Sequence, residues 1–239
     1  MSDGDFDKYD TIGAYHWEEC DRRYANWKRF NPPLIGRYQL VVDQIARLKP
    51  DRLLDIGCGD AKLLSLAGKH AGKATGIDLE ETGIRLAKEK LKDYPNCEAI
   101  HNTCYELPFD EASFDAAISA DVIEHLNDRE AHLREIHKIL KPGGTLILTT
   151  PRSLPGGLQD QRHVHEYQAD ELRDFAGKIF DRVEMRYYWP QKWINRYNTK
   201  IGWRLLKLLG VQLWNPFMSS SESNPEDYTQ LMAVCHKAS

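Results

Sequence analysis

Four residues in the first half of the chain have the types and spacing to hold a small ligand. Gly57 and Gly59 follow an apolar run at a turn into a predicted helix, where glycines let a ligand approach the backbone closely. Asp78 follows the next apolar run, 21 residues after Gly57, where a carboxylate can accept both hydroxyls of a ribose. Asp55 adds an acidic group two residues before the first glycine. The pattern predicts a site for a nucleoside-containing cofactor.

Two plainer interpretations compete with this one. A dinucleotide-binding protein uses the same turn, but its fingerprint needs Gly or Ala at the sixth position, and Lys62 stands there. Asp78 could simply be a negative charge near the start of the next helix, but Glu80 and Glu81 already supply that charge. We therefore favour the ribose role for Asp78.

A second group of residues has the types needed for acid–base or metal chemistry. Asp121, Glu124 and His125 are spaced i, i+3, i+4 after the fourth apolar run, which puts them on one face if the stretch is helical. His163 and His165 follow the fifth run and would approach from another strand end. Such groups can form a divalent-metal site or an acid–base pair, and a structural role in the loop is a third possibility. We take His125 and His165 as catalytic candidates and assign no metal ligand.

Alternating strands and helices must position these residues. Apolar strands are predicted at 52–56, 74–79, 98–102, 114–120 and 145–150, with helices at 60–69, 80–92 and 127–140. Repeated strand–helix–strand units form a parallel sheet with helices on both faces, and ligands bind beyond the carboxyl ends of its strands. His132 and His137 fall on the last of these helices, and we expect them at the surface.

The composition argues against several other classes of protein. The 239 residues carry a net charge of −4, which disfavours bulk electrostatic binding to nucleic acid. No uncharged apolar run approaches the roughly 20 residues that span a bilayer. The acidic first ten residues lack a secretory apolar region, and the five cysteines form no CxxC pair. We expect a cytoplasmic protein without a disulfide framework.

Five ordered motifs make the chain resemble the class I S-adenosylmethionine-dependent methyltransferases. They are residues 53–60, 76–78, 107–115, 123–126 and 140–144. The resemblance covers roughly residues 35–185 and is strongest to the small-molecule group that includes the ubiquinone-biosynthesis O-methyltransferases. It implies an α/β fold: a Rossmann-like, seven-stranded, mostly parallel sheet with helices on both faces and the last strand antiparallel. It also implies S-adenosylmethionine as the cofactor.

The resemblance assigns parts of the cofactor to particular residues. It implies that Asp55, Gly57 and Gly59 line the methionine part, and that Asp78, with Leu79 beside it, holds the ribose. Adenine usually lies by an acidic residue before the Leu-Pro-Phe run, where this chain has Thr103 followed by Cys104. We assign adenine contacts to those two residues.

Two further assignments depend on the ubiquinone-pathway enzymes. Their N-terminal helix carries an arginine that pairs with the cofactor carboxylate, and Arg37 is the candidate here, with a surface charge as the plainer interpretation. These enzymes and small-RNA ribose methyltransferases also hold a metal with a Glu-x-x-Glu-His motif, whose first position is the shorter Asp121 in this chain. We assign Asp121 to the cofactor site.

The predicted function is methyl transfer from S-adenosylmethionine to a small or lipid-like acceptor, with oxygen as the expected acceptor atom. The alternatives are an RNA ribose methyltransferase, a nicotinamide-dependent oxidoreductase and a non-catalytic cofactor-binding module. We expect no nucleic-acid partner and no transmembrane segment, and keep peripheral membrane contact open.

Three parts of the chain are predicted. Residues 1–45 form an aromatic-rich cap and leading helix, 46–189 with 227–239 form the core, and 190–226 are an insertion. Within the insertion a helix over 200–209 would have one basic face and one apolar face, the latter made by Ile201, Leu205 and Leu208. That apolar face could pack on the domain, cover the acceptor pocket or contact a membrane surface, and we predict a cover for the acceptor site.

Overall fold

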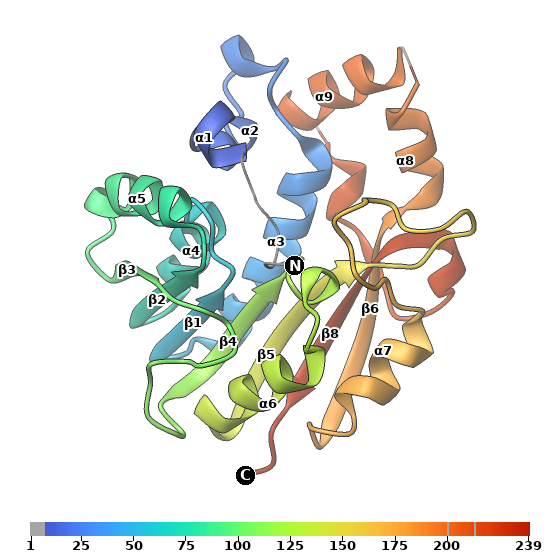
Figure 1. Ribbon diagram of the computed structural model, residues 1–239. Coiled ribbons are helices and arrows are strands. Elements are labelled where there is room, and N and C mark those ends of the chain that lie inside the picture. The colour runs from blue at the N-terminus through green and yellow to red at the C-terminus, as the bar shows by residue number, and fades with distance from the viewer. Residues whose placement is uncertain (1–7, 200, 213) are drawn as a thin grey trace.

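The computed structural model describes residues 8–199, 201–212 and 214–239 (Figure 1). Its centre is one sheet with the strand order β3-β2-β1-β4-β5-β8-β6-β7. The strands are β1 (Arg52–Ile56), β2 (Lys73–Asp78), β3 (Cys97–His101), β4 (Phe114–Ala120), β5 (Leu140–Pro151), β6 (Arg182–Pro190), β7 (Ser220–Ser221) and β8 (Tyr228–His236).

The sheet confirms the predicted Rossmann-like class but has eight strands, not seven. Strands β1 to β5 pair in parallel, and β8 pairs antiparallel with both β5 and β6, as expected for the last strand. The extra strand is β7, a two-residue strand that pairs with β6. It comes from the insertion, and a pair of serines carries no periodicity from which a strand could have been predicted.

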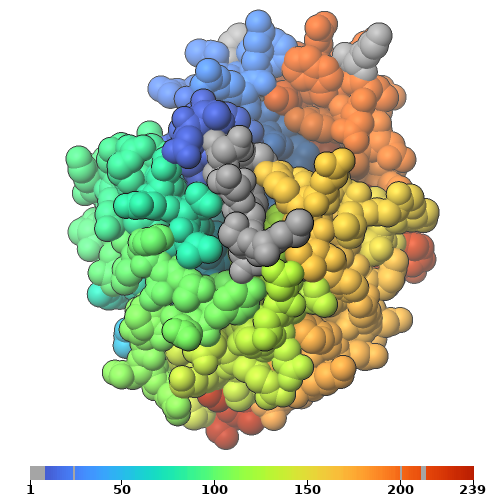
Figure 2. All heavy atoms as spheres, in the orientation of Figure 1, coloured from blue at the N-terminus to red at the C-terminus, as the bar shows by residue number. Residues whose placement is uncertain are grey.

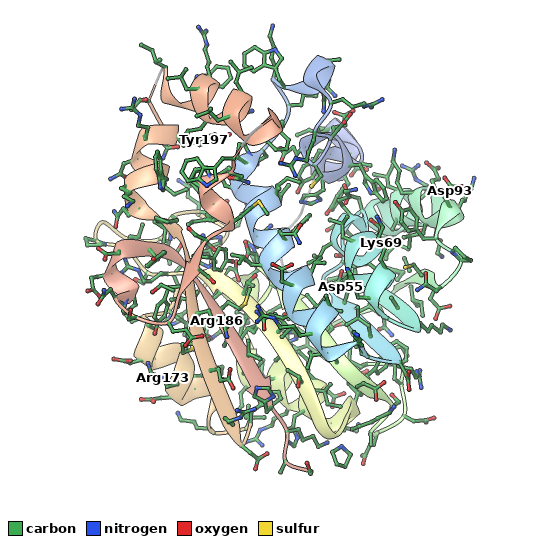
Figure 3. All side chains as sticks on the ribbon, turned by 180° about the vertical axis from the view of Figure 1, so that it is seen from behind. Asp55, Lys69, Asp93, Arg173, Arg186 and Tyr197 are labelled. Atoms are coloured by element: carbon green, nitrogen blue, oxygen red, sulfur yellow. The ribbon has the colours of Figure 1, made fainter. Side chains whose placement is uncertain are left out.

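Helices cover both faces of the sheet, as predicted. The α-helices are α1 (Lys8–Ile12), α2 (Tyr15–Glu19), α3 (Pro32–Leu48), α4 (Lys62–Ala67), α5 (Glu81–Lys90), α6 (Arg129–Ile139), α7 (Ala169–Ala176), α8 (Gln191–Tyr197) and α9 (Gly202–Gln212). The 3₁₀ helices are η1 (Tyr24–Asn26), η2 (Gly68–His70), η3 (Leu91–Asp93), η4 (Ile123–His125), η5 (Pro216–Met218) and η6 (Pro225–Asp227). Helices α3, α4 and α5 lie on one face, and α6 and α7 lie on the other (Figures 1 and 3).

Two apolar layers hold the helices to the sheet. Successive strand residues point to opposite faces, so Leu53 joins the layer under α3 to α5 while Leu54 joins the layer under α6 and α7. Residues from the central strands β1 and β4 are almost all buried, which explains their nearly continuous apolar sequences. The carboxyl ends of these strands are thereby fixed relative to one another.

One histidine departs from the expected surface position. His132 of α6 is fully buried, and its ring nitrogens contact the Ser119 hydroxyl at 3.1 Å and the Cys104 carbonyl at 3.3 Å. Burial lowers its pKa to about 4. Position 132 shares the inner face of α6 with Leu133 and Ile136, whereas the residue type had suggested solvent.

Apart from the short strand β7, the insertion packs against α3. Phe217 of η5 is buried, and its backbone oxygen occupies the place where a side chain at Gly36 of α3 would begin. The Asn215 amide donates to the Pro32 carbonyl at 2.8 Å, and the ring of Tyr197 (Figure 3) lies edge-to-face with Phe217. Glycine at position 36 therefore lets the insertion approach the helix closely.

The predicted helix in the insertion exists as α9, but it buries a different face. Its inner face is Gly202, Leu206 and Gly210, and the predicted apolar face containing Ile201 and Leu205 is exposed. Gly210 lets the helix lie close to Phe30 and Pro32, and Gly202 lets it lie close to the Arg196 carbonyl, so the glycine face turns inward. Among the residues that the structure describes, no helix combines the length and apolar character that crossing a bilayer requires.

Candidate active site

A cavity of about 450 Å³ lies at the carboxyl ends of β1, β2 and β4. Its volume is in the range of small-molecule sites, and it lies where open α/β sheets bind ligands. The wall formed by the turns after β1, β2 and β3 is called the cofactor wall below. The wall formed by η4 and the loop between β5 and α7 is called the reactive wall.

Main-chain geometry shapes the cofactor wall around Gly57. Gly57 has a φ of +76°, and a side chain there would overlap the Val122 methyl group, so both conformation and space require glycine. The Gly57 and Cys58 amides both donate to the Ile77 carbonyl, at 2.8 and 3.0 Å, which ties the turn to β2. The turn is thus rigid before any ligand arrives.

Asp78 is held by two backbone donors at the end of β2. Its carboxylate accepts from the Gly59 amide at 2.7 Å and from the Glu80 amide at 2.8 Å. Burial raises the pKa of Asp78, while these amides oppose that shift. Each carboxylate oxygen retains a second lone pair, so the group can still accept hydroxyl hydrogens from a ligand.

Asp55, labelled in Figure 3, is a buried carboxyl on this wall. Its side chain is 1% exposed, and one carboxyl oxygen has no hydrogen-bond partner among the described residues. Burial, and then the charge of Asp78, raise its pKa to about 8. A buried, unpartnered carboxyl beside a cavity suits a ligand that brings an N–H donor or a positive charge, and the predicted cofactor has both.

Arg37 and Asp121 form an ion pair across the cavity. The Arg37 side chain is only 11% exposed and lies near the rings of Tyr38 and Trp189, which excludes the interpretation as a surface charge. Asp121 has a φ of +54° and accepts from the Thr149 hydroxyl at 2.8 Å. This left-handed turn replaces the expected helical spacing, so Asp121 faces Arg37 and does not join Glu124 and His125.

The adenine-side candidates also line the cavity. Leu79, Thr103 and Cys104 are all part of its wall, and the Thr103 hydroxyl accepts from the Tyr105 amide at 3.3 Å. Gly59 is the exception among the predicted cofactor residues, because it does not line the cavity. The hydroxyl of Tyr9 lies where a side chain at position 59 would begin.

The reactive wall is centred on Glu124 of η4. The side chain is 1% exposed; one oxygen accepts from the Thr150 hydroxyl at 3.0 Å, and the other has no partner within the described chain. Burial raises its pKa to about 7. The Glu124 carbonyl accepts from the amides of Val164 and His165, which ties η4 to the loop after β5.

Two imidazoles lie next to Glu124. The rings of His125 and His163 are 4.9 Å apart and edge-to-face. His125 Nδ1 lies 3.2 Å from the Arg162 carbonyl, and His163 Nδ1 lies 2.5 Å from the buried carboxylate of Glu166. Burial lowers the pKa of His125. Both rings are therefore oriented by their Nδ1 atoms, as in metal-ligating histidines and in acid–base dyads.

The same wall has the donors for a cation. Ligand atoms of Glu124, His125 and His163 lie within 4.8 Å of one another. Two imidazoles and one carboxylate are a known set for divalent transition metals, and they are equally the parts of an acid–base site. The geometry keeps both alternatives open.

His165, the second catalytic candidate, lies elsewhere. It is absent from the cavity wall; its Nε2 contacts Glu171 at 2.6 Å, and its ring packs on Tyr167. His163 takes the position expected for it. His163 and His165 are separated by one position in an irregular loop. Neither a helical nor a strand periodicity applies there, so the sequence pattern does not indicate which side chain turns inward.

The N-terminal segment closes the cavity, which sequence reasoning had only partly anticipated. Tyr9, Tyr15 and His16 line the cavity. The His16 amide donates to the Asp60 carboxylate at 3.1 Å, and His16 Nδ1 lies 3.1 Å from the other oxygen of that carboxylate. Figure 2 shows this segment beside α5. None of the described residues of the insertion lines the cavity, so its predicted role as acceptor cover has no support from the structure.

Comparisons with known proteins agree with this site. A model of the methyltransferase domain family matches residues 54–148. The demethylmenaquinone methyltransferase of Lysinibacillus sphaericus is 30% identical over 156 residues, covering 63% of this chain and 65% of that protein. The enzyme of the same name from Staphylococcus aureus strain JH9 is 29% identical over 175 residues, covering 71% and 70%. The match spans only 60–65% of the length of the first such relatives.

Solved structures share the fold. Phosphoethanolamine N-methyltransferase 2 of Haemonchus contortus, solved with S-adenosyl-L-methionine, has a TM-score of 0.67 at 19% identity, covering 100% of this chain and 60% of that one. The YcgJ protein of Bacillus subtilis has a TM-score of 0.60 at 17% identity, covering 84% and 98%. Fold, glycine turn and domain match together make the chain similar to class I S-adenosylmethionine-dependent methyltransferases, with the methyltransferase domain matched over residues 54–148. Within that class, its sequence is similar to demethylmenaquinone methyltransferases.

Proposed function

We propose that this protein transfers the methyl group of S-adenosylmethionine to an oxygen atom of a small, lipid-like acceptor. The similarity to demethylmenaquinone methyltransferases supports an acceptor of this kind. The observation that carries the proposal is the pairing of two unlike walls in one cavity. Buried carboxyls line the cofactor wall, and oriented imidazoles line the wall opposite.

The cofactor wall has suitable groups for each part of the cofactor. Asp78 would accept the ribose hydroxyls, and Thr103 with Cys104 would contact the adenine. Asp55 would accept from the amino group of the methionine part, and Arg37 would pair with its carboxylate, in competition with Asp121. When bound, the cofactor supplies an electrophilic methyl group, whose bond to sulfur breaks as the bond to the acceptor oxygen forms.

The reactive wall would receive the acceptor proton. His163, oriented by Glu166, and His125, kept neutral by burial, both have the geometry of a general base. Transfer of the acceptor hydroxyl proton to imidazole leaves an oxygen nucleophile, and the Glu166 carboxylate stabilises the imidazolium that results. An acceptor with an acidic hydroxyl, such as a phenol or enol, suits a base of this strength.

The N-terminal segment would cover the acceptor. Tyr9, Tyr15 and His16 place aromatic surface over the cavity, and covering excludes water from a reactive methyl donor. This assigns residues 1–45 the role of cap and residues 46–189 with 227–239 the role of catalytic core.

A transfer assay tests the proposal. Purified protein is incubated with S-adenosylmethionine labelled in its methyl group, together with a lipid extract or an RNA extract of the source cell. We expect label in an organic-soluble product whose mass rises by one methyl group, and less label with Asp78→Ala when S-adenosylmethionine is below saturation. Label in RNA alone would contradict the proposal in favour of a ribose methyltransferase. Calorimetric binding of a nicotinamide dinucleotide, without binding of S-adenosylhomocysteine, would favour an oxidoreductase.

A further inference from the structure

The insertion displays an apolar stripe on its outer surface. Ile201, Leu205 and Leu209 follow one another at intervals of four residues along α9, and all are exposed, Ile201 by 70%. Trp214 continues the line, with its amide bonded to the Leu209 carbonyl at 3.0 Å and its side chain 52% exposed. Trp193 of α8 lies edge-to-face with Trp214. Contiguous exposed apolar side chains of this kind mark interaction sites.

The stripe is not a core face that has turned outward by accident. The neighbouring face of α9, about 100° around the helix axis, is already packed, with Leu206 and Gly210 turned inward toward Phe30 and Pro32. The Lys207 ammonium donates to the Lys28 carbonyl at 2.7 Å, and the Trp203 ring stacks on Trp27. The helix thus has two apolar faces, and only one of them serves the fold.

The charged side chains of the insertion around the stripe are all positive. Residues 191–221 contain no Asp or Glu, although the whole chain is acidic with a net charge of −4. Their basic residues are Lys192, Arg196, Lys200, Arg204 and Lys207. Lys192, Arg196 and Arg204 are exposed and have no ion-pair partner within the described residues, whereas Arg23 and Arg29 of the neighbouring segment are paired with carboxylates.

We infer that the surface formed by residues 191–199, 201–210 and 214, called the insertion surface below, docks on an anionic lipid bilayer. Exposed Leu, Ile and Trp side chains beside Lys and Arg are the composition of helices that lie in the membrane interface. Each basic group near an anionic leaflet adds to the electrostatic attraction. A second copy of the chain fits less well, because a symmetric contact would bring like charges together without an acidic partner.

The insertion surface lies at a useful place on the molecule. Helices α8 and α9 stand at the same end as α1 and α2, beyond the carboxyl ends of β1 and β4 where the cavity lies (Figure 1). A bilayer in contact with α9 would therefore lie at the cavity end of the protein. Docking itself does not depend on the proposed methyl transfer and is measured without it.

Vesicle flotation tests the inference. Full-length protein is floated with phosphatidylcholine vesicles and with vesicles containing about 30% phosphatidylglycerol, at low salt and at about 0.5 M salt. We expect binding to the anionic vesicles that salt weakens. The variant Ile201→Gln, Leu205→Gln, Leu209→Gln should lower the partition coefficient by about tenfold or more. The matched control Leu48→Gln, Leu158→Gln removes exposed apolar side chains elsewhere and should bind like the wild type.

Further measurements distinguish an anionic bilayer from a second copy of the chain as the partner of the insertion surface. The tryptophan emission should shift to the blue on vesicle binding, and Trp214→Phe should remove most of that shift. Lys192→Gln, Arg196→Gln, Arg204→Gln should abolish the preference for anionic vesicles. Unchanged affinity for S-adenosylhomocysteine in every variant checks that the fold is intact. An equal loss of vesicle binding in the Leu48 and Leu158 control would overturn the inference. So would a dimer that forms without vesicles and that the triple α9 variant dissociates.

Discussion

The two walls of the cavity are built on different principles. On the cofactor wall, Asp78 is held by amides of the adjacent turns, and the glycine turn is bonded to the end of the neighbouring strand. On the reactive wall, His125 and His163 come from segments about 40 residues apart, joined through the Glu124 carbonyl. The first wall therefore depends on local sequence, and the second on how a long loop folds back.

The comparison explains how far each wall could be predicted. The cofactor residues Asp55, Gly57 and Asp78 were predicted from spacing because strand ends and glycine turns have local signatures, and the structure places them together. The choice between His163 and His165 had no such signature: His165 was chosen from the sequence, and the structure places His163 in the cavity wall. Which one faces inward depends on Glu166 and on the tie to η4, neither of which has a periodic pattern.

The largest expected effect tests the reactive wall. His163→Ala should lower the methyl-transfer rate by roughly 10²- to 10⁴-fold, because it removes a positioned general base. The dissociation constant of S-adenosylhomocysteine should stay nearly unchanged. His125→Ala should behave similarly, and single-turnover kinetics with calorimetry measures both quantities.

His165→Ala is the matched control for that comparison. It lies on the same loop but outside the cavity, so its rate should equal that of the wild type. A loss in His165→Ala as large as that in His163→Ala would break the distinction between the two residues. If chelator removes all activity and a divalent ion restores it, the imidazoles are metal ligands and not a free base.

The next effect concerns the buried support of the cofactor wall. His132 connects β4 to the Cys104 loop, and its folded pKa of about 4 lies below the ordinary value of about 6.5. The unfolded chain therefore binds the proton more tightly, so this contribution is complete above pH 6.5 and is lost as the pH falls toward 4. The loss amounts to about 2–3 kcal/mol between pH 7.5 and 4.5.

Denaturant unfolding of the wild type and His132→Gln measures this contribution. The difference in their free energies of unfolding should shrink by that amount over the same pH range. A difference that is equal at both pH values would mean that His132 is not kept neutral by the fold.

A smaller effect tests the ribose position. Asp78→Ala removes charge-assisted hydrogen bonds worth about 1.5–3 kcal/mol, so the affinity for S-adenosylhomocysteine should fall about tenfold or more. The affinity for 5′-methylthioadenosine, which keeps the ribose, should fall equally. Glu81→Ala, an exposed carboxylate in the first turn of α5, should change neither value.

The smallest effect separates the methionine end of the cofactor from the nucleoside end. Arg37→Gln should lower the affinity for S-adenosylhomocysteine by about five- to tenfold, because a charged hydrogen bond to the ligand carboxylate is lost. The effect is small because Asp121 already competes for the Arg37 guanidinium. The affinity for 5′-methylthioadenosine, which has no carboxylate, should not change. An equal loss for both ligands would place Arg37 at another part of the cofactor.

The fold shows the same division between local and distant information. The strand and helix alternation through residue 151 and the antiparallel last strand follow from periodicity and resemblance, and the structure confirms them. The sequence pattern predicted an apolar face on α9 with Ile201 and Leu205 but left its packing open, and in the structure both side chains are exposed. The glycines at 202 and 210 decided the packing instead, and close approach of backbones leaves little trace in a hydrophobic pattern.

The contact between Gly36 and Phe217 has a consequence for the history of the chain. A relative without the insertion has no segment that packs against α3 at this point. Glycine in the middle of a helix weakens the helix, so it would bring no benefit there. Alanine or a larger residue would then be favoured at the equivalent position. The glycine and the insertion should thus have been inherited as a pair, and this one helical position marks which related sequences carry the extra segment.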